Sequence, residues 1–174
     1  MTDSTDMTDL HVTWDGYNRL IERLAVMIHD SDWQFDAIIC LARGGLRVGD
    51  ALSRIFDKPL GVMTTSSYRA SGGMVQGNLK IGDQISAAEE VTSGRVLLAD
   101  DLVDSGVTLQ AVIPELHRRY PAISEIRTAV LWYKSVSVIK PDYYAQFLQS
   151  SPWIHQPFEA YEGCDIESLR RPPR

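Results

Sequence analysis

The sequence predicts an α/β domain in which a mostly parallel central sheet carries helices on both faces. Three observations support this prediction. Strand-like and helix-like segments alternate through the middle of the 174-residue chain. The strand-like segments are continuous apolar runs, which is typical of parallel strands that are buried on both faces. The chain also contains no internal repeat, no low-complexity tract and no clear linker, so a single domain is the simplest organisation.

Three segments have helical spacing. In the first, apolar side chains recur on one face of a helix over residues 14–29, at Tyr17, Leu20, Ile21, Leu24, Ala25 and Ile28. The same spacing predicts helices over 46–56 and 107–120, and Pro114 is an expected irregularity in the last of them.

Four short apolar runs predict buried strands, at residues 36–42, 60–66, 95–101 and 125–133. The glycines of "RGG" (43–45) end the first run, and the second helix follows them. Strand and helix therefore alternate as they do in units that build a parallel sheet.

The stretch from Ser67 to Gly94 is long, polar and rich in glycine. A connection of this length inside a compact domain is usually either functional or disordered, so we expect a β-ribbon or a mobile flap. After Tyr133 the pattern becomes aromatic and irregular, with the units "KPDYY" and "SPW".

Charge and composition exclude several classes of function. The net charge is −6, so a general electrostatic attraction to nucleic acid or to an anionic membrane is not expected. No stretch approaches the ~20 apolar residues of a membrane span, and the polar, acidic start resembles neither a secretory signal nor a transit peptide. We therefore expect a cytoplasmic protein with a flexible tail at 1–12 and one domain over 13–174.

The cysteines and histidines show no metal-ligand pattern in the sequence. Cys40 lies inside an apolar run, as a buried thiol would, and Cys164 is far from it. The four histidines are scattered and no two share metal-ligand spacing, which predicts no histidine metal site at His11, His29, His117 and His155.

The most informative stretch is "VLLADDLVDSGVT" (96–108). Asp100 and Asp101 end a buried strand, and ligands of open α/β sheets bind beyond the carboxyl ends of the strands. The next residues form a loop that enters a helix: Asp104, Ser105, Gly106, Val107 and Thr108. Backbone N–H groups, the helix dipole and two hydroxyls would make this loop a phosphate-binding site without a lysine.

Two carboxylates beside a phosphate need another partner, because they would otherwise repel it. Two adjacent sugar hydroxyls can donate hydrogen bonds to the carboxylates, and a magnesium ion can bridge the remaining oxygens. The stretch therefore fits a ligand with a phosphate at one end, vicinal hydroxyls in the middle and a metal-bound anion beyond them.

Three other interpretations apply to the same residues. An acidic surface turn remains open, although the buried strand before it argues against it. The Asp-Ser-Gly of an aspartic protease needs a paired aspartate in an all-β fold, which the alternating helices oppose. The metal-binding strand of a nucleoside triphosphatase would require a G-x-x-x-x-G-K-[ST] loop, which the chain does not contain.

The stretch "VLLADDLVDSGVTL" resembles the signature of the type I phosphoribosyltransferases. "LARGGL" (41–46) resembles the family's pyrophosphate loop, and "SSY" (66–68) resembles the catalytic flap of its 6-oxopurine branch. Residues 132–159 are similar to the purine-binding hood of the xanthine–guanine and hypoxanthine enzymes, and we expect a hood over about 134–165.

The resemblance implies 5-phosphoribosyl-1-pyrophosphate as the ligand and Mg²⁺ as the cofactor. Asp100 and Asp101 would hold the ribose hydroxyls and the metal, while 104–108 would bind the 5′-phosphate. Arg43 and the Gly44 N–H would bind pyrophosphate, although Gly44 also fits a plain strand-to-helix turn.

Further roles follow from the same resemblance. Ser67 would contact the substrate and Tyr68 would close over the pyrophosphate as a catalytic residue of the flap. Glu159 lies where relatives carry an acidic residue near a second magnesium.

The base-binding residues are implied in the same way. Asp104 would exchange a proton with purine N7, and Lys134 would donate to O6. Trp153 would stack on the base and Ile154 would offer backbone contacts to its edge. Structural alternatives remain for three of them: Asp104 closing its own loop, Lys134 facing solvent and Trp153 lying in the core.

The expected reaction joins guanine, xanthine or hypoxanthine to the phosphoribosyl group and releases a nucleoside 5′-monophosphate and pyrophosphate, as in purine salvage. The resemblance also implies a homodimer or homotetramer. The alternative is a non-catalytic regulatory relative that senses phosphoribosyl pyrophosphate or nucleotides and binds nucleic acid. Such proteins usually need a basic face, which the net charge of −6 does not favour.

Overall fold

The computed structural model describes residues 9–67 and 79–170. The chain forms two compact units: Leu20–Ser151, and a smaller unit made of Met1–Arg19 with Pro152–Arg174. No helix among the described residues combines the length and the hydrophobicity that crossing a membrane requires.

The larger unit is built on a six-stranded sheet with the order β4-β3-β2-β5-β6-β7. Every neighbouring pair is parallel except β3 and β4. The strands are β2 (Ala37–Ala42), β3 (Leu60–Ser67), β4 (Leu79–Ala87), β5 (Gly94–Val103), β6 (Ile123–Lys134) and β7 (Tyr143–Leu148). The predicted α/β fold with a mostly parallel sheet is confirmed.

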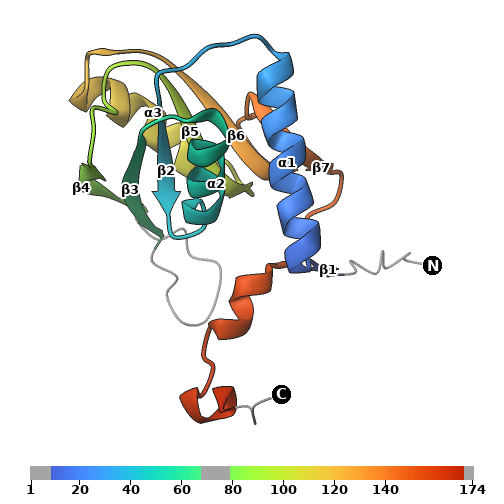
Figure 1. The fold of residues 1–174 in the computed structure, drawn as a ribbon. Helices are drawn as coiled ribbons and strands as arrows, with labels where there is room; N and C mark the ends of the chain where they lie inside the picture. Colours follow the sequence, from blue (N-terminus) through green and yellow to red (C-terminus); the bar gives the residue numbers. More distant parts are fainter. Residues whose placement is uncertain (1–8, 68–78, 171–174) are drawn as a thin grey trace. The chain divides into compact units, whose positions relative to one another are not determined.

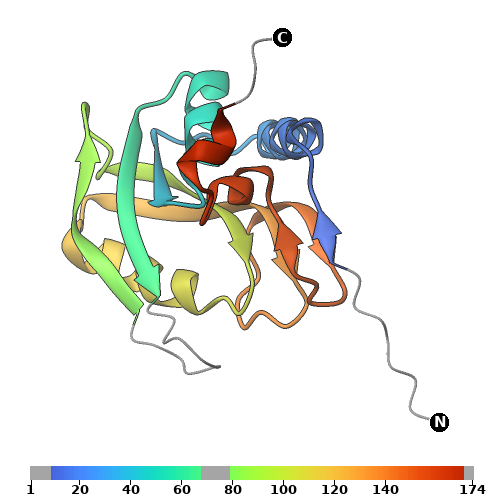
Figure 2. The same ribbon diagram turned by 90° about the horizontal axis from the view of Figure 1, so that it is seen from below.

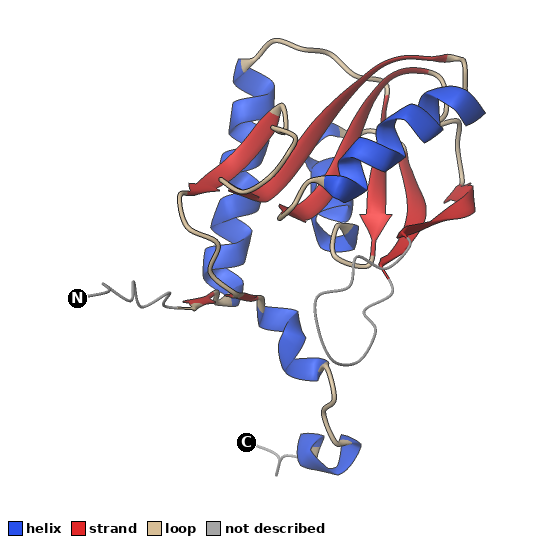
Figure 3. Ribbon diagram, turned by 180° about the vertical axis from the view of Figure 1, so that it is seen from behind, coloured by secondary structure: helices blue, strands red, loops and turns tan. Residues whose placement is uncertain are grey.

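Helices cover both faces of this sheet. α3 (Val107–Arg119) lies on one face, and α2 (Leu46–Phe56) lies on the other together with the part of α1 (Trp14–Asp30) that begins at Leu20 (Figures 1 and 3). Alternate strand residues therefore pack on opposite helices: Ile39 and Leu41 belong to the cluster that contains Leu109 and Val112 of α3.

The central strands are buried on both faces, as their continuous apolar sequences predicted. In β2 and β5, seven residues are fully inaccessible to solvent: Ile38, Ile39, Cys40, Val96, Leu97, Leu98 and Ala99. On the α2 side, Gly49 packs so closely on β2 that an added Cβ would lie 2.5 Å from the Cβ of Cys40. Neither face of these strands could tolerate a charged side chain without a partner.

The four predicted strands and three predicted helices all occur within one or two residues at most ends. The difference that matters is at β5, which continues two residues beyond the predicted end at 101 to Val103, so that Asp100 and Asp101 lie inside the strand. Within the predicted β-ribbon, β4 pairs antiparallel with β3, and residues 68–78 lie outside the described part of the chain.

The smaller unit holds a two-stranded parallel ribbon of β1 (Leu10–His11) and β8 (Ile154–His155). Two short 3₁₀ helices follow β8, η1 (Pro157–Tyr161) and η2 (Ile166–Leu169), and are drawn in red near the carboxyl end in Figure 2. Within this unit, the ring of Tyr17 meets that of Phe158 edge to face, with centroids 6.0 Å apart.

Candidate active site

The residues of the 96–108 stretch lie at the carboxyl edge of the parallel sheet. β5 occupies a central position between β2 and β6, so the ends of three neighbouring strands meet there. The loop after β2 brings Arg43 and Gly44, β5 brings the two aspartates, and β6 ends at Lys134. This is the edge at which open α/β sheets bind their ligands.

Asp100 is a carboxyl group in an unfavourable position for a charge. Burial, and then the negative charge of Asp101, raise the pKa of Asp100 well above its usual range. Its Oδ1 accepts a hydrogen bond of 2.9 Å from the Asp101 N–H, which opposes this rise only in part. Hydroxyl donors or a divalent cation at this position would favour the charged form, so the pair fits both a ribose diol and Mg²⁺.

Gly44 allows the loop after β2 to approach Asp101. An added Cβ at Gly44 would lie 2.5 Å from Asp101 Oδ1 and 2.6 Å from its other carboxylate atoms. Gly45 is packed against the main chain instead, where a Cβ would lie 2.7 Å from the carbonyl oxygens of Leu41 and Ala99. The Ala42–Arg43 peptide bond in this loop is cis. The alternative of a plain glycine turn does not explain why the carboxylate of Asp101 lies so near.

The loop at 104–108 has the form that an anion-binding site needs. Gly106 has a φ of 81° and is the N-cap residue of α3, so no side chain caps the first turn of this helix. The N–H groups in the first turn of a helix have no intrahelical partners, and the helix dipole adds partial positive charge to them. The Val138 N–H donates a 2.9 Å hydrogen bond to the Ser105 carbonyl and so fixes the loop from the segment after β6.

Both the backbone conformation at position 106 and the lack of room for a side chain there require glycine. A Cβ at this position would overlap Ser137 Oγ and lie 2.7 Å from Ile139 Cγ2. Ser137 and Ile139 thus pack against the 104–108 loop, and nothing in their local sequence could have indicated this.

Lys134 forms an ion pair with Asp104. Its Nζ lies 3.3 Å from Asp104 Oδ1, and its side chain is 5% exposed whereas that of Asp104 is 58% exposed. The pairing of Val103 with Tyr133 in the β5–β6 ladder brings the two residues together. Lys134 is therefore not a solvent-facing lysine, and the alternative interpretation of it is wrong. The pair presents an ammonium donor beside an exposed carboxylate.

Other predicted residues are found elsewhere in the chain. Trp153, Ile154 and Glu159 belong to the smaller unit, where Trp153 is 52% exposed and so is not a core tryptophan. Ser67 ends β3 opposite Leu79, and Tyr68 lies outside the described residues. The roles of these residues stay predictions.

The family model of the phosphoribosyl transferase domain matches residues 13–163. The chain belongs to the phosphoribosyltransferase family. Its enzyme class is therefore that of the transferases, and the resemblance noted in the 96–108 stretch is confirmed.

The chain is similar to purine phosphoribosyltransferases from bacteria and archaea. A xanthine-guanine phosphoribosyltransferase from Ruegeria sp. is 26% identical over 89% of this chain and 92% of its own length. A hypoxanthine/guanine phosphoribosyltransferase from Aciduliprofundum boonei is 30% identical over 75% of this chain and 68% of its own length. Among solved structures, the chain is similar to the crystal structure of a purine phosphoribosyltransferase from Pyrococcus horikoshii, with a TM-score of 0.69 and a sequence identity of 32%. The superposition covers 87% of this chain and 95% of the other.

Proposed function

We propose that this phosphoribosyltransferase transfers the 5-phosphoribosyl group from 5-phosphoribosyl-1-pyrophosphate to a 6-oxopurine. The observation that carries the proposal is the ion pair of a buried lysine, Lys134, with the exposed carboxylate of Asp104, beside the loop at 104–108. The names of the relatives, which cite xanthine, guanine and hypoxanthine, agree with it.

The pair matches one edge of a 6-oxopurine. O6 is a hydrogen-bond acceptor and N7 is its neighbour on the same edge, so an ammonium donor suits O6 while a carboxylate suits a proton at N7. An ammonium has three donors and no acceptor, and adenine presents an amino donor at its 6-position. Lys134 therefore favours guanine, hypoxanthine and xanthine over adenine.

The phosphoribosyl group would be held by neutral donors and by the aspartates. The N–H groups of 104–108 and the hydroxyls of Ser105 and Thr108 would bind the 5′-phosphate. Asp100 and Asp101 would accept hydrogen bonds from the ribose hydroxyls. Arg43 and the Gly44 N–H would bind the pyrophosphate.

Mg²⁺ would be held by Asp101 and Asp100, whose crowded charges a divalent cation would relieve. When bound, the metal supplies neutralisation of the charge on the pyrophosphate leaving group. Glu159 is proposed for a second magnesium, on the resemblance alone.

The chain's own residues would then act on the base and the sugar. As a purine nitrogen forms its bond to the anomeric carbon and pyrophosphate leaves, Asp104 would hold the proton at N7 and Lys134 would fix O6. Ser67 and Tyr68 would cover the pyrophosphate and exclude water, which would otherwise hydrolyse the activated sugar. Trp153 and Ile154 would hold the face and edge of the base.

The proposal includes a cytoplasmic role in purine salvage and a homodimer or homotetramer, as the resemblance implies. The regulatory alternative would bind nucleic acid and show no turnover, and a net charge of −6 argues against it.

A panel of bases tests the proposal. The full chain is incubated with the sugar donor, magnesium and each of hypoxanthine, guanine, xanthine, adenine, orotate or uracil, and pyrophosphate release is followed. We expect release with 6-oxopurines and little with the others. No release with any base, together with retention on heparin at low salt, would favour the regulator.

Variants of the Lys134–Asp104 ion pair test whether the measured activity depends on this site. Lys134→Gln should lower kcat/KM for 6-oxopurines by about 10- to 100-fold, because it removes a hydrogen bond to a charged donor. Asp104→Asn should lower kcat by about 10²-fold or more while sparing binding of the sugar donor. Lys58→Gln, two residues before β3 and therefore near the amino ends of the parallel strands, is the matched control. Equal activity in all three variants would contradict the assignment.

A further inference from the structure

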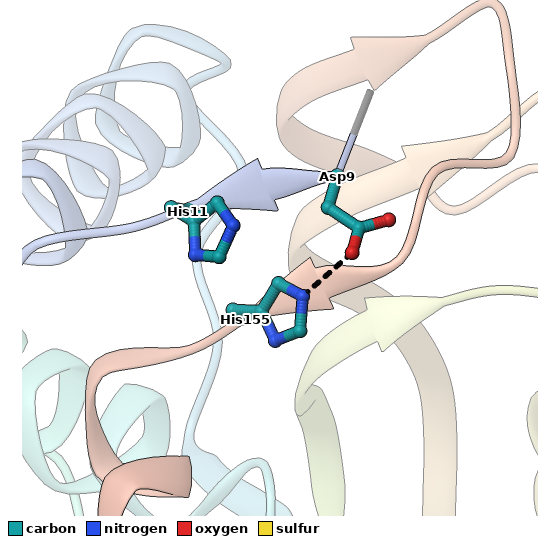
Figure 4. Close-up of side chains that lie close together, drawn as sticks. All are labelled: Asp9, His11 and His155. Carbon is teal, nitrogen blue, oxygen red and sulfur yellow. Dashed lines mark hydrogen bonds and ion pairs between the residues drawn. The ribbon is translucent and has the colours of Figure 1, made fainter. Parts of the chain in front are cut away.

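A second cluster of chemically active side chains lies on the ribbon of the smaller unit. β1 and β8 pair in parallel with His11 opposite His155, so the two imidazoles lie on the same face. Their rings stack with centroids 4.3 Å apart and planes 9° from parallel. His155 Nε2 lies 2.9 Å from Asp9 Oδ2, and the three side chains face one another in Figure 4.

This cluster has the donors and spacing of a metal site. One ligand atom from each of Asp9, His11 and His155 lies within 4.8 Å of the other two. A tetrahedral ion with bonds of about 2.0–2.1 Å places its ligand atoms roughly 3.3–3.4 Å apart. The stacked rings would therefore have to turn toward a common point. Asp9 and His11 are exposed and His155 is partly exposed, so side-chain rotation can supply that movement.

We propose that Asp9, His11 and His155 bind a first-row transition-metal ion, with Zn²⁺ as the ion to test. Two imidazoles and a carboxylate are ligands that zinc accepts, and three protein ligands leave a position for water. Mg²⁺ prefers oxygen ligands and would not be expected to select a site with two nitrogens.

The surroundings of the cluster supply further oxygen atoms. A pocket lined by His11 and His155 is also lined by Glu159 and Glu162. These carboxylates can accept hydrogen bonds from a metal-bound water and so orient it. Glu159 thus belongs to the same pocket as the two histidines.

A bound ion would stabilise the pairing of β1 with β8, because its ligands come from both sides of this ribbon. β1 contains two residues, and its ribbon contacts include the Leu10 N–H donating to Trp153 O at 2.8 Å and the Val12 N–H donating to His155 O at 3.0 Å. A short two-stranded ribbon is marginally stable in water, so a ligand that joins both strands should reduce its opening.

The inference does not depend on the proposed function, and metal binding is measured without substrates. Untagged full chain is stripped with a chelator, dialysed and titrated with Zn²⁺ by calorimetry, and the Co²⁺ form is followed by its visible absorption. We expect one strong site per chain and the absorption of tetrahedral Co²⁺. Absence of strong Zn²⁺ binding would overturn the proposal.

Matched variants locate the site. His11→Gln and His155→Gln should each weaken Zn²⁺ binding by at least about tenfold, since loss of even an outer-shell partner costs roughly 10- to 100-fold. Asp9→Asn should weaken it as well. His29→Gln and His117→Gln change exposed histidines on α1 and α3 and should leave the affinity unchanged. Unchanged affinity in His11→Gln, or a loss confined to His117→Gln, would overturn the proposal.

A structural readout supports the titration. Zn²⁺ should slow amide hydrogen exchange in residues 9–12 of the wild-type chain and not in His155→Gln, with far-UV circular dichroism confirming that the variant is folded. Equal slowing in both proteins would show that the ion acts elsewhere and would overturn the assignment.

Discussion

Replacing Gly44 with alanine tests the link between the loop after β2 and Asp101. The backbone at Gly44 is not left-handed, so the cost of an alanine comes from its contacts. Its Cβ would lie 2.5 Å from Asp101 Oδ1, whereas ordinary contacts begin at 3.4 Å, so the carboxylate must retreat by about 0.9 Å. A misplacement of about 1 Å at a reacting site can cost roughly 10²-fold in rate. We therefore expect kcat/KM to fall by about 100-fold.

Gly45→Ala is the matched control, because it makes a similar clash with different atoms. Its Cβ would lie 2.7 Å from the Leu41 and Ala99 carbonyl oxygens and 2.9 Å from Asp100 Cα, all of which belong to the main chain. Two central strands would have to move, and overpacking of this kind costs about 1–3 kcal/mol. Gly45→Ala should thus lower the free energy of unfolding, whereas in Gly44→Ala a side chain can give way and stability should change less.

The assay combines steady-state pyrophosphate release with urea unfolding of both variants. A double-mutant cycle makes the test specific: if Gly44→Ala acts through Asp101, it should add little in an Asp101→Asn background. The reasoning would be refuted if a folded Gly44→Ala chain kept activity within a few-fold of wild type, or if the two single effects simply multiplied.

Two further predictions concern groups whose pKa the fold has shifted. Burial and the charge of Asp101 raise the pKa of Asp100, so the folded chain binds the proton of this carboxyl group more tightly than the unfolded chain does. The protonated carboxyl therefore contributes to stability at low pH, and this contribution is lost as pH rises from about 3.9, the unfolded value, through the raised value. Asp100→Asn should therefore be the more stable protein above that window and gain nothing below it, as urea unfolding across pH would reveal; parallel pH profiles would contradict this. Burial, followed by the charge of Asp100, raises the pKa of Cys40 to about 11, so a thiol reagent at about pH 8 should quickly label only Cys164 in the folded chain and both cysteines after unfolding. Rapid labelling of both thiols in the native protein would contradict the burial of Cys40.

The sequence predicted those parts of the fold that are encoded locally. Continuous apolar runs identified β2, β3, β5 and β6, because strands buried on both faces have no polar side to interrupt them. β7 and β8 were not predicted, since their aromatic and proline-containing segments carry neither a period of two nor a helical period. The extension of β5 to Val103 was missed because charged residues usually mark the end of a strand.

In the candidate site, too, the residues of one continuous stretch could be predicted, whereas the contacts between distant segments could not. The aspartates and the proposed phosphate loop lie within one continuous stretch, so the order of these residues alone was enough to propose their chemistry. The ion pair of Lys134 with Asp104 depends on the β5–β6 register, and the meeting of His11 with His155 depends on pairing between distant segments. No local spacing encodes such contacts. This explains why the four histidines predicted no metal site although two of them are neighbours in space.

The two charged features of the larger unit have a common physical logic. Asp100 is an acid that burial and its neighbour Asp101 both disfavour in the charged form. Lys134 is a buried cation whose ion-pair partner, Asp104, remains largely open to solvent. Each arrangement becomes more favourable when a ligand adds donors to the aspartates or an acceptor to the lysine. If these residues bind the substrate as proposed, the site would lower the stability of the free protein and regain it on binding, so that Asp100→Asn should strengthen the fold and weaken the site.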